Sequence, residues 1–355
     1  MKYTPESVIR NDPENMAGGI YNFIDDLNTA MNVDVDFKAS FKNILVCGMG
    51  GSAISGDMLA DCAASIADYP IRVQRFPEIP KWVNKDTLCV VTSYSGNTRE
   101  TLALYDYAKE KNFQTVVIAA GGTLMEKAEE DGVYTLKMIP GIQPRCATGY
   151  SLGLMFSLLD SLGQPAFGDL TKKIIPKLRK FRDSLASNRS VAWEIARKIN
   201  GRTPIIYSSS TIGSVATRWK TQINENSKMI AFSGSVPEFN HNEVSGWSEG
   251  AVRDSCVPIF LYEEKSGKFK KRLMDASIST IRSYGVEPIV VDVRGRTVVE
   301  KVLRATLIGD YVSLYLAYIN GVDPSEVASI KELKLRLGDI LGSLKVKSTK
   351  TKKRI

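Results

Sequence analysis

The chain has 355 residues, of which 43% are hydrophobic and 24% are charged, so it is long enough for two globular domains and too apolar for a disordered chain. Its net charge of +8 lies mostly in the last eleven residues, which carry six Lys or Arg, so composition does not indicate a nucleic-acid-binding body. No uninterrupted apolar run reaches the ~20 residues of a membrane-spanning helix, and no signal-peptide pattern opens the chain, so we expect a cytoplasmic protein with no membrane partner.

Strand-like apolar runs alternate with helical patterns through the first half of the chain, which is typical of a parallel sheet with crossover helices. A strand at 42–48 and a helix at 52–66 enclose a glycine-rich turn. Strand–turn–helix units are expected at 86–111 and 115–132, with further strands at 71–76 and 132–140 and a helix at 146–163. These elements predict an α/β fold.

The same plan restarts after a polar, basic helical stretch at 170–199, which we interpret as a connector. A strand, a Ser/Thr-rich turn and a helix are expected at 203–228, followed by strands at 257–263 and 287–293. A long apolar helix beginning near Arg304 should end at Gly321 as its C-cap, and the last helix, at 329–341, is amphipathic. The sequence therefore predicts two α/β halves, each opening with a strand and a small-residue turn.

The turn in VCGMGGSAISGD admits more than one ligand. Gly48, Gly50 and Ala53 fit the dinucleotide pattern G-x-G-x-x-A, but the second strand ends without the acid that holds a ribose hydroxyl. Arg75 at that position would suit a 2′-phosphate, so an NADP-dependent oxidoreductase stays an alternative. A P-loop needs a lysine that this turn lacks, so ATP or GTP hydrolysis is poorly supported.

The next strand-to-helix turn, TSYSGNTRET, offers hydroxyls from Ser93, Ser95 and Thr98. Both turns should emerge at the carboxyl edge of the sheet, where backbone N–H groups, hydroxyls and helix N-termini suit a phosphate dianion. Ordinary N-capping explains one such turn equally well. Two consecutive turns of this kind favour one bound phosphate.

GGSAISGD followed by SYSGNTRETL resembles the sugar isomerase (SIS) fold, and NDPENM, NENSKMIAF, PEFNHNEVSGW and IKELKLRL resemble the bifunctional phosphoglucose/phosphomannose isomerases of archaea and some bacteria. The resemblance runs from Asp12 to about Leu341. It implies two three-layer αβα domains of SIS type, each with a mainly parallel sheet flanked by helices. We place the N-terminal domain at 1–165, the C-terminal domain with its connector at 166–342 and a basic disordered tail at 343–355.

The resemblance also implies an isomerase that interconverts glucose 6-phosphate, and mannose 6-phosphate, with fructose 6-phosphate through a cis-enediolate. The residues that would hold the substrate phosphate are Gly51, Ser52, Ser93, Ser95 and Thr98. The base that moves the proton would be Glu225. Glu225 lies near the end of an expected helix, where the dipole favours a protonated carboxylate, although a surface Glu in a polar run fits the sequence as well.

Three further residues receive roles from the resemblance. His241, the only histidine, would open the sugar ring from across a dimer interface, oriented by Glu238 or Glu243. Lys334 would assist ring opening, and Arg145 would stabilise the enediolate. From the sequence alone, each of these three also reads as a surface residue.

This mechanism needs no redox cofactor and no metal. Five cysteines at wide spacings predict neither a disulfide framework nor a zinc site, and Cys47 and Cys89 are expected in the core. The expected partners are a sugar phosphate and a second copy of the chain in a homodimer with a shared active site. We do not expect nucleic-acid binding, except through the basic tail. A non-catalytic phosphosugar sensor stays the main alternative function.

Overall fold

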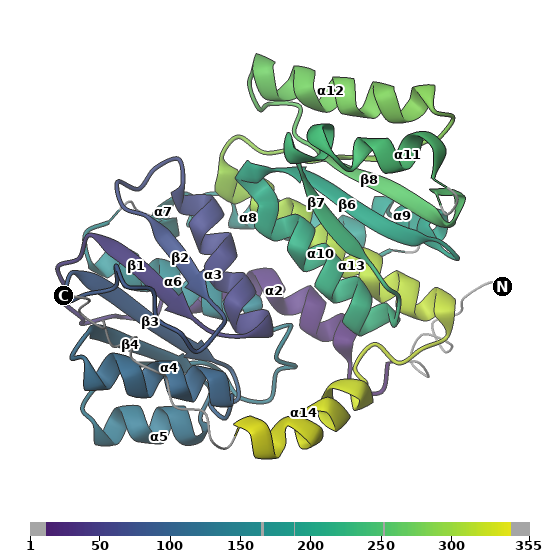
Figure 1. Cartoon of the computed structure of the whole chain (residues 1–355). Coiled ribbons are helices and arrows are strands. Elements are labelled where there is room, and N and C mark those ends of the chain that lie inside the picture. The colour runs from purple at the N-terminus through teal and green to yellow at the C-terminus, as the bar shows by residue number, and fades with distance from the viewer. Residues whose placement is uncertain (1–11, 165–166, 188, 251–252, 342–355) are drawn as a thin grey trace, which may run out of the picture. The chain divides into compact units, whose positions relative to one another are not determined.

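The computed structural model describes residues 12–164, 167–187, 189–250 and 253–341, and it divides into two compact units. The first-sheet unit comprises residues 26–168 and 327–341, and the second-sheet unit comprises residues 12–25 and 169–326 (Figure 1). Each unit carries one parallel sheet, so the expected pair of α/β halves is confirmed. The linear boundary at 165/166 stays a prediction, and the tail at 343–355 lies outside the described residues.

The first sheet has five parallel strands in the order β2-β1-β3-β4-β5. Strands that follow one another in the chain are neighbours in the sheet, except that β2 and β3 lie on opposite sides of β1. In sheets of this kind, ligands bind beside the strand at which the order reverses. The strands are β1 (Asn43–Cys47), β2 (Ile71–Gln74), β3 (Thr87–Ser93), β4 (Gln114–Ala119) and β5 (Tyr134–Lys137). All five correspond to expected strands.

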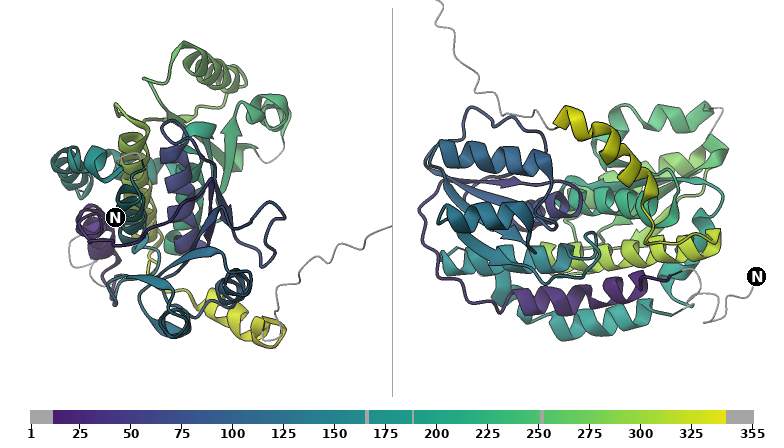
Figure 2. Two further views of the ribbon diagram at one scale, coloured as in Figure 1. Left: turned by 90° about the vertical axis from the view of Figure 1, so that its left-hand side faces the viewer. Right: turned by 90° about the horizontal axis from the view of Figure 1, so that it is seen from below.

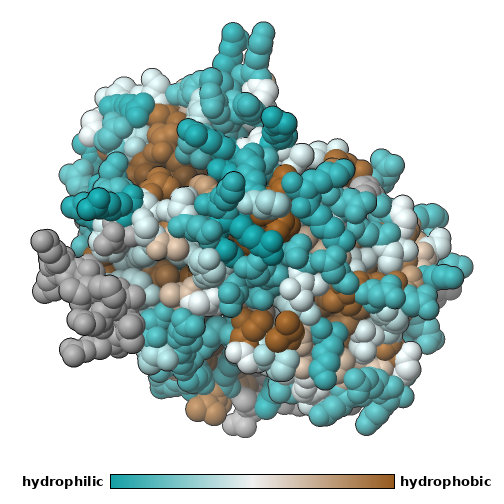
Figure 3. Space-filling view, turned by 180° about the vertical axis from the view of Figure 1, so that it is seen from behind, coloured by the Kyte–Doolittle hydropathy of each residue, from teal (hydrophilic) through white to brown (hydrophobic). Residues whose placement is uncertain are grey.

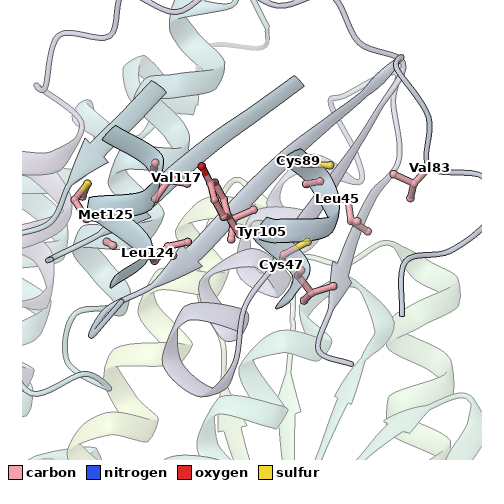
Figure 4. Close-up of a cluster of buried hydrophobic side chains, with 13 residues drawn as sticks. Leu45, Cys47, Val83, Cys89, Tyr105, Val117, Leu124 and Met125 are labelled. Atoms are coloured by element: carbon pink, nitrogen blue, oxygen red, sulfur yellow. The ribbon is translucent and has the colours of Figure 1, made fainter. Parts of the chain in front are cut away.

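Helices cover both faces of the first sheet. On one face, α4 (Arg99–Glu110) and α5 (Gly122–Glu130) bury the alternate strand residues that include Cys47 and Cys89, as Figure 4 shows. On the other face, α3 (Gly50–Ala63) lies so close to β1 that a Cβ on Gly56 would meet the Val46 side chain at 2.7 Å. The unit also contains α6 (Thr148–Ser161), which packs on α3, and α14 (Ala328–Leu341) (Figure 2).

The second sheet has four parallel strands in the order β7-β6-β8-β9. They are β6 (Thr203–Ser209), β7 (Phe232–Val236), β8 (Cys256–Tyr262) and β9 (Ile289–Asp292). The sequence did not predict β7, because it is an edge strand with an exposed start and Gly and Ser within it, and it therefore lacks a buried apolar pattern.

Helices α10 (Gly213–Ser227) and α13 (Val298–Asn320) pack closely on one another beside this sheet, and α12 (Lys268–Ser283) shares a core with its other face. The shorter α11 (Val244–Glu249) and three short 3₁₀ segments connect these elements. The expected connector is not one helix but α7 (Phe167–Lys172), α8 (Ile175–Leu185) and α9 (Val191–Ile199). The remaining helix, α2, spans Met16–Ala30.

Helix α13 has the length and hydropathy of a membrane span, but 89% of its most apolar window is buried inside the protein. It packs against α10, α9 and α8, so it is the core helix of its unit. Its end at Gly321, which adopts a left-handed conformation with φ 68°, confirms the predicted C-cap.

Candidate active site

The turn between β1 and α3 brings the start of that helix against two other segments. A Cβ on Gly48 would lie 2.8 Å from the Thr92 carbonyl oxygen, and a Cβ on Gly51 would lie 2.9 Å from the Pro144 carbonyl oxygen. Any side chain at either position would push the neighbouring backbone away, so glycine is required at both. Met49, the N-cap residue, offers no side-chain acceptor to the first-turn amides of α3, which leaves this helix end suited to an external anion.

The turn between β3 and α4 presents the expected hydroxyls. Ser93 is buried and its Oγ donates to the Thr98 Oγ1 at 3.1 Å. Thr98 is the N-cap residue of α4, yet its side chain accepts no bond from the helix amides, so the capping explanation is wrong at this position. Ser95 is exposed at the rim, where its Oγ accepts the Asn97 N–H at 3.3 Å.

Tyr94 links the two turns, and the sequence analysis missed its role. Its N–H donates to the Ser52 Oγ at 3.2 Å, which joins the second turn to the first. Its hydroxyl donates to the Ile139 carbonyl at 3.1 Å and accepts the Ile142 N–H at 2.7 Å. Burial raises the pKa of this hydroxyl, so it stays a neutral donor. The one feature of the sequence that could have indicated this role is the aromatic side chain between Ser93 and Ser95.

Arg145 follows the segment that Tyr94 holds. Its side chain is buried, and its Cα would lie 3.4 Å from a Cβ on Gly51, which places it against the first turn. Its carbonyl accepts the Thr148 hydroxyl at 3.1 Å at the start of α6. The first-sheet unit therefore gathers two helix N-termini, several hydroxyls and one arginine at a single edge, an arrangement that suits an anionic ligand. We call Gly51, Ser52, Ser93, Ser95 and Thr98 the hydroxyl cradle.

Glu225 lies half-buried near the end of α10 in the second-sheet unit. Lys228 ends this helix in a left-handed conformation, and its Nζ donates to the Glu225 carbonyl at 2.8 Å. The neighbouring Asn226 donates to the Ser313 Oγ of α13 at 2.9 Å. The backbone that carries Glu225 is therefore held at the end of α10.

About two helical turns before Glu225, a buried ion pair aligns α10 with α13. The Arg218 Nε and Nη2 donate to the two carboxylate oxygens of Asp310 at 2.9 and 2.7 Å, and Gln222 adds a bond of 3.2 Å to the same carboxylate. Both charged side chains are at most 2% exposed. Such a bidentate pair holds the helices in one register, which positions Glu225.

His241 is exposed in a 3₁₀ turn that follows β7. Of the two carboxylates considered as its orienting partner, Glu238 accepts the Asn242 amide at 2.8 Å and Glu243 faces the Tyr207 hydroxyl. Because α10 runs back along the sheet, Glu225 lies at the amino end of β7 and His241 at its carboxyl end. The five residues of β7 at ~3.3 Å each separate these ends by about 16 Å.

Lys334 is exposed on α14, which belongs to the first-sheet unit. The apolar side chains beside it are not covered by the described part of this chain, since Ile330 is 36% and Leu333 is 56% exposed. The predicted residues thus fall into two groups: the cradle, Arg145 and Lys334 belong to the first-sheet unit, and Glu225 and His241 belong to the second-sheet unit.

Arg75, which in the sequence suited the 2′-phosphate of NADP, forms an ion pair with Asp57. Both of its terminal nitrogens contact the Asp57 carboxylate, and the Nη1 distance is 3.3 Å. A ligand phosphate would have to displace that carboxylate, so the geometry does not favour the NADP alternative.

Comparisons with known proteins bear on both units. The SIS domain family matches residues 39–162, and the family described as the bacterial phospho-glucose isomerase C-terminal SIS domain matches residues 188–337. A solved hypothetical protein from Thermus thermophilus superposes with a TM-score of 0.74 at 14% identity, covering 95% of this chain and 94% of that one. These matches confirm the expected SIS fold.

Curated relatives extend the likeness over most of the chain. The bifunctional phosphoglucose/phosphomannose isomerase of Caldicellulosiruptor bescii is 34% identical over 92% of this chain and 99% of its own length. The enzyme of the same name from Aquifex aeolicus is 34% identical over 84% and 91%. A D-glucosamine-6-phosphate 4-epimerase of Sulfolobus acidocaldarius is 30% identical over 70% and 78%. The chain belongs to the family of bifunctional phosphoglucose/phosphomannose isomerases.

Proposed function

We propose that this protein is an aldose–ketose isomerase that interconverts glucose 6-phosphate and mannose 6-phosphate with fructose 6-phosphate in the cytoplasm. The observation that carries the proposal is the hydroxyl cradle with the buried Arg145 beside it. Hydroxyls that cap no helix, at the ends of two adjacent strands, suit one terminal phosphate and leave the sugar chain to reach toward Arg145.

In the proposed reaction, Glu225 takes the C2 proton of the open-chain aldose and returns it to C1. The electron pair passes to the carbonyl oxygen O1 and forms a cis-enediolate, which the Arg145 guanidinium stabilises, and the O2 hydroxyl proton moves to O1 as C1 is protonated. His241 and Lys334 transfer protons during ring opening. The step exchanges protons within one substrate, so it requires neither a redox cofactor nor a metal.

The positions of Glu225 and His241 support a homodimer. In one chain they lie at opposite ends of β7, a strand about 16 Å long. A second copy that supplies His241 would let the two residues approach one hexose from different chains. The uncovered apolar side chains of α14 also leave room for a contact between copies.

Mixing two inactive variants tests the shared site. Glu225→Gln and His241→Ala homodimers should each lose activity, whereas their heterodimer regains one site with both native residues. After mixing and subunit exchange, we expect about one quarter of the native activity, because half of the dimers are mixed and each carries one intact site. Failure to recover activity in a verified heterodimer would contradict the shared site.

The function itself is tested by a coupled assay with glucose 6-phosphate and mannose 6-phosphate, each with and without EDTA. We expect turnover of both substrates, unchanged by the chelator. Glucosamine 6-phosphate serves as the comparison substrate, because one relative is an epimerase of that sugar. Epimerisation of glucosamine 6-phosphate without isomerisation of either hexose 6-phosphate would overturn the proposal, and so would binding without turnover, the behaviour of a phosphosugar sensor.

A further inference from the structure

We propose that a groove along the free edge of the second sheet binds a nucleoside 5′-phosphate at a site separate from the hydroxyl cradle. The groove has a volume of 780 Å³, and its walls come from β9, α9 and the first half of α13. β9 is the edge strand opposite β7, the strand that leads to His241. None of the residues proposed for catalysis lines it.

The described lining of the groove carries more cations than carboxylates: Lys198, Arg202, Arg282, Arg294 and Arg304 against Glu194, Glu287 and Asp292. Lys198 and Arg202 line it, and neither has a carboxylate within ion-pair distance among the described residues; the Arg202 Nη2 instead donates to the Lys198 carbonyl at 2.6 Å. Arg282 and Arg294, by contrast, are paired with neighbouring acids at 2.8 and 2.5 Å. The lining thus has two more cations than carboxylates, although Glu287 offsets part of the charge of Lys198.

Arg304 adds a desolvated cation at the groove wall. Its side chain is 12% exposed, and its guanidinium carbon lies 3.9 Å from the centroid of the Phe181 ring. The carboxylate of Glu300 is 3.9 Å away and is already engaged by Lys177 and the Arg296 N–H, at 2.5 and 2.9 Å. Burial lowers the pKa of Arg304. Phosphate oxygens are the natural partners for its planar donors.

An apolar wall faces these cations. Val191 and Val290 line the groove and are 50% and 40% exposed, and Ile195 and Ile308 lie behind them. Patches of apolar surface framed by hydrophilic side chains are visible on the face drawn in Figure 3. Apolar contact area next to unpaired cations, in a space of this size, fits a planar ring joined to a phosphate better than it fits an inorganic anion.

A peptide strand added to β9 fits less well. β9 has only four residues, and the charged pair of Asp292 and Arg294 stands at its end, a common way to block pairing at a sheet edge. These observations favour a small ligand over an extended segment of a partner protein.

Calorimetric titration of the full-length protein with AMP tests the proposal, with adenosine and inorganic phosphate as partial ligands. We expect one AMP per chain and about tenfold weaker binding of each partial ligand, since each retains only part of the contacts. Arg202→Glu should weaken AMP binding about tenfold or more, by reversing one charge next to the phosphate. The matched control is Arg272→Glu on α12, an exposed position that changes the same charge and does not line the groove.

A second pair of measurements locates the ligand. Ser95→Asp places a carboxylate in the hydroxyl cradle and should leave AMP affinity unchanged, and hydrogen exchange should slow in α9 and β9 when AMP is bound. Absence of AMP binding would overturn the proposal, as would equal weakening by Arg202→Glu and Arg272→Glu. Loss of binding in Ser95→Asp would show that AMP occupies the cradle, which also contradicts it.

Discussion

Thr98 is the N-cap residue of α4, but its hydroxyl accepts no hydrogen bond from the helix amides. Replacing it therefore tests the proposed role of the hydroxyl in phosphate binding without removing a helix cap. Thr98→Val should raise the KM for the hexose 6-phosphate about tenfold, because a hydrogen bond to a charged group contributes roughly 1.5 kcal/mol. The free energy of unfolding should fall by about 1 kcal/mol, because valine removes the acceptor of the buried Ser93 hydroxyl. Steady-state kinetics and denaturant unfolding measure the two effects.

Ser190 provides the matched control, because its Oγ accepts the Trp193 N–H at 3.2 Å and does cap α9. Ser190→Ala should lower the free energy of unfolding by about 1 kcal/mol and leave KM unchanged. If Thr98→Val leaves KM unchanged, as Ser190→Ala does, the hydroxyl is structural and the assignment to phosphate is wrong.

Local sequence order could predict Gly51, Ser52, Ser93, Ser95 and Thr98 as a group, because each lies where a strand becomes a helix, and such turns meet at one sheet edge. It could not predict the role of Tyr94. The partners of its hydroxyl, Ile139 and Ile142, are 45 and 48 residues away, and no local pattern encodes that contact.

At the scale of elements, Tyr94 ties the turn after β3 to the segment that leads to Arg145. Tyr94→Phe removes both hydroxyl bonds and keeps the ring, so Arg145 should lose its fixed position while the cradle stays intact. We expect kcat to fall about tenfold, equivalent to about 1.4 kcal/mol in the barrier, with KM nearly unchanged.

The control for this split is Tyr105→Phe, which removes the hydroxyl that donates to Asp131 at 2.7 Å, on α4 away from the turn. It should leave both kinetic constants near their native values. A rise in KM without a fall in kcat for Tyr94→Phe would show that Tyr94 supports phosphate binding rather than Arg145.

The contact between α10 and α13 depends on the buried pair of Arg218 and Asp310. Arg218→Met leaves an uncompensated buried carboxylate, so the free energy of unfolding should fall by about 3 to 5 kcal/mol. The double variant Arg218→Met/Asp310→Leu should recover most of that loss, because it removes both charges. Denaturant unfolding measures all three proteins.

A surface pair offers the comparison. Arg336 and Glu332 pair on α14 with side chains 75% and 64% exposed, and Arg336→Ala should change stability by less than about 1 kcal/mol. If Arg218→Met costs no more than Arg336→Ala, the buried pair does not hold the two helices, and the argument for a fixed Glu225 fails.

The elements themselves were largely predictable where burial was strong. The fully buried β3 and the capped end of α13 at Gly321 follow from apolar runs and from glycine's tolerance of positive φ. The exposed edge strand β7 was not predictable in this way. Its residues show no buried apolar pattern, and it forms a strand because it pairs with β6.

At the scale of the whole molecule, the alternation of strands and helices predicted two α/β halves. It did not predict which of the two units each end of the chain joins. Residues 12–25 pack with the second-sheet unit and residues 327–341 with the first. This exchange places Lys334 in the same unit as the cradle although it follows the second half in sequence. Only long-range packing decides it, and no motif spacing carries that information.

The most direct test of the account follows the proton. Fructose 6-phosphate incubated in D₂O with the native protein should acquire deuterium at C2 of the glucose and mannose 6-phosphates formed, as detected by NMR. Glu225→Gln should still bind the sugar phosphate but show roughly a 1,000-fold slower exchange, about 4 kcal/mol in the barrier. Exchange at the native rate in Glu225→Gln would contradict the central claim that this carboxylate moves the proton.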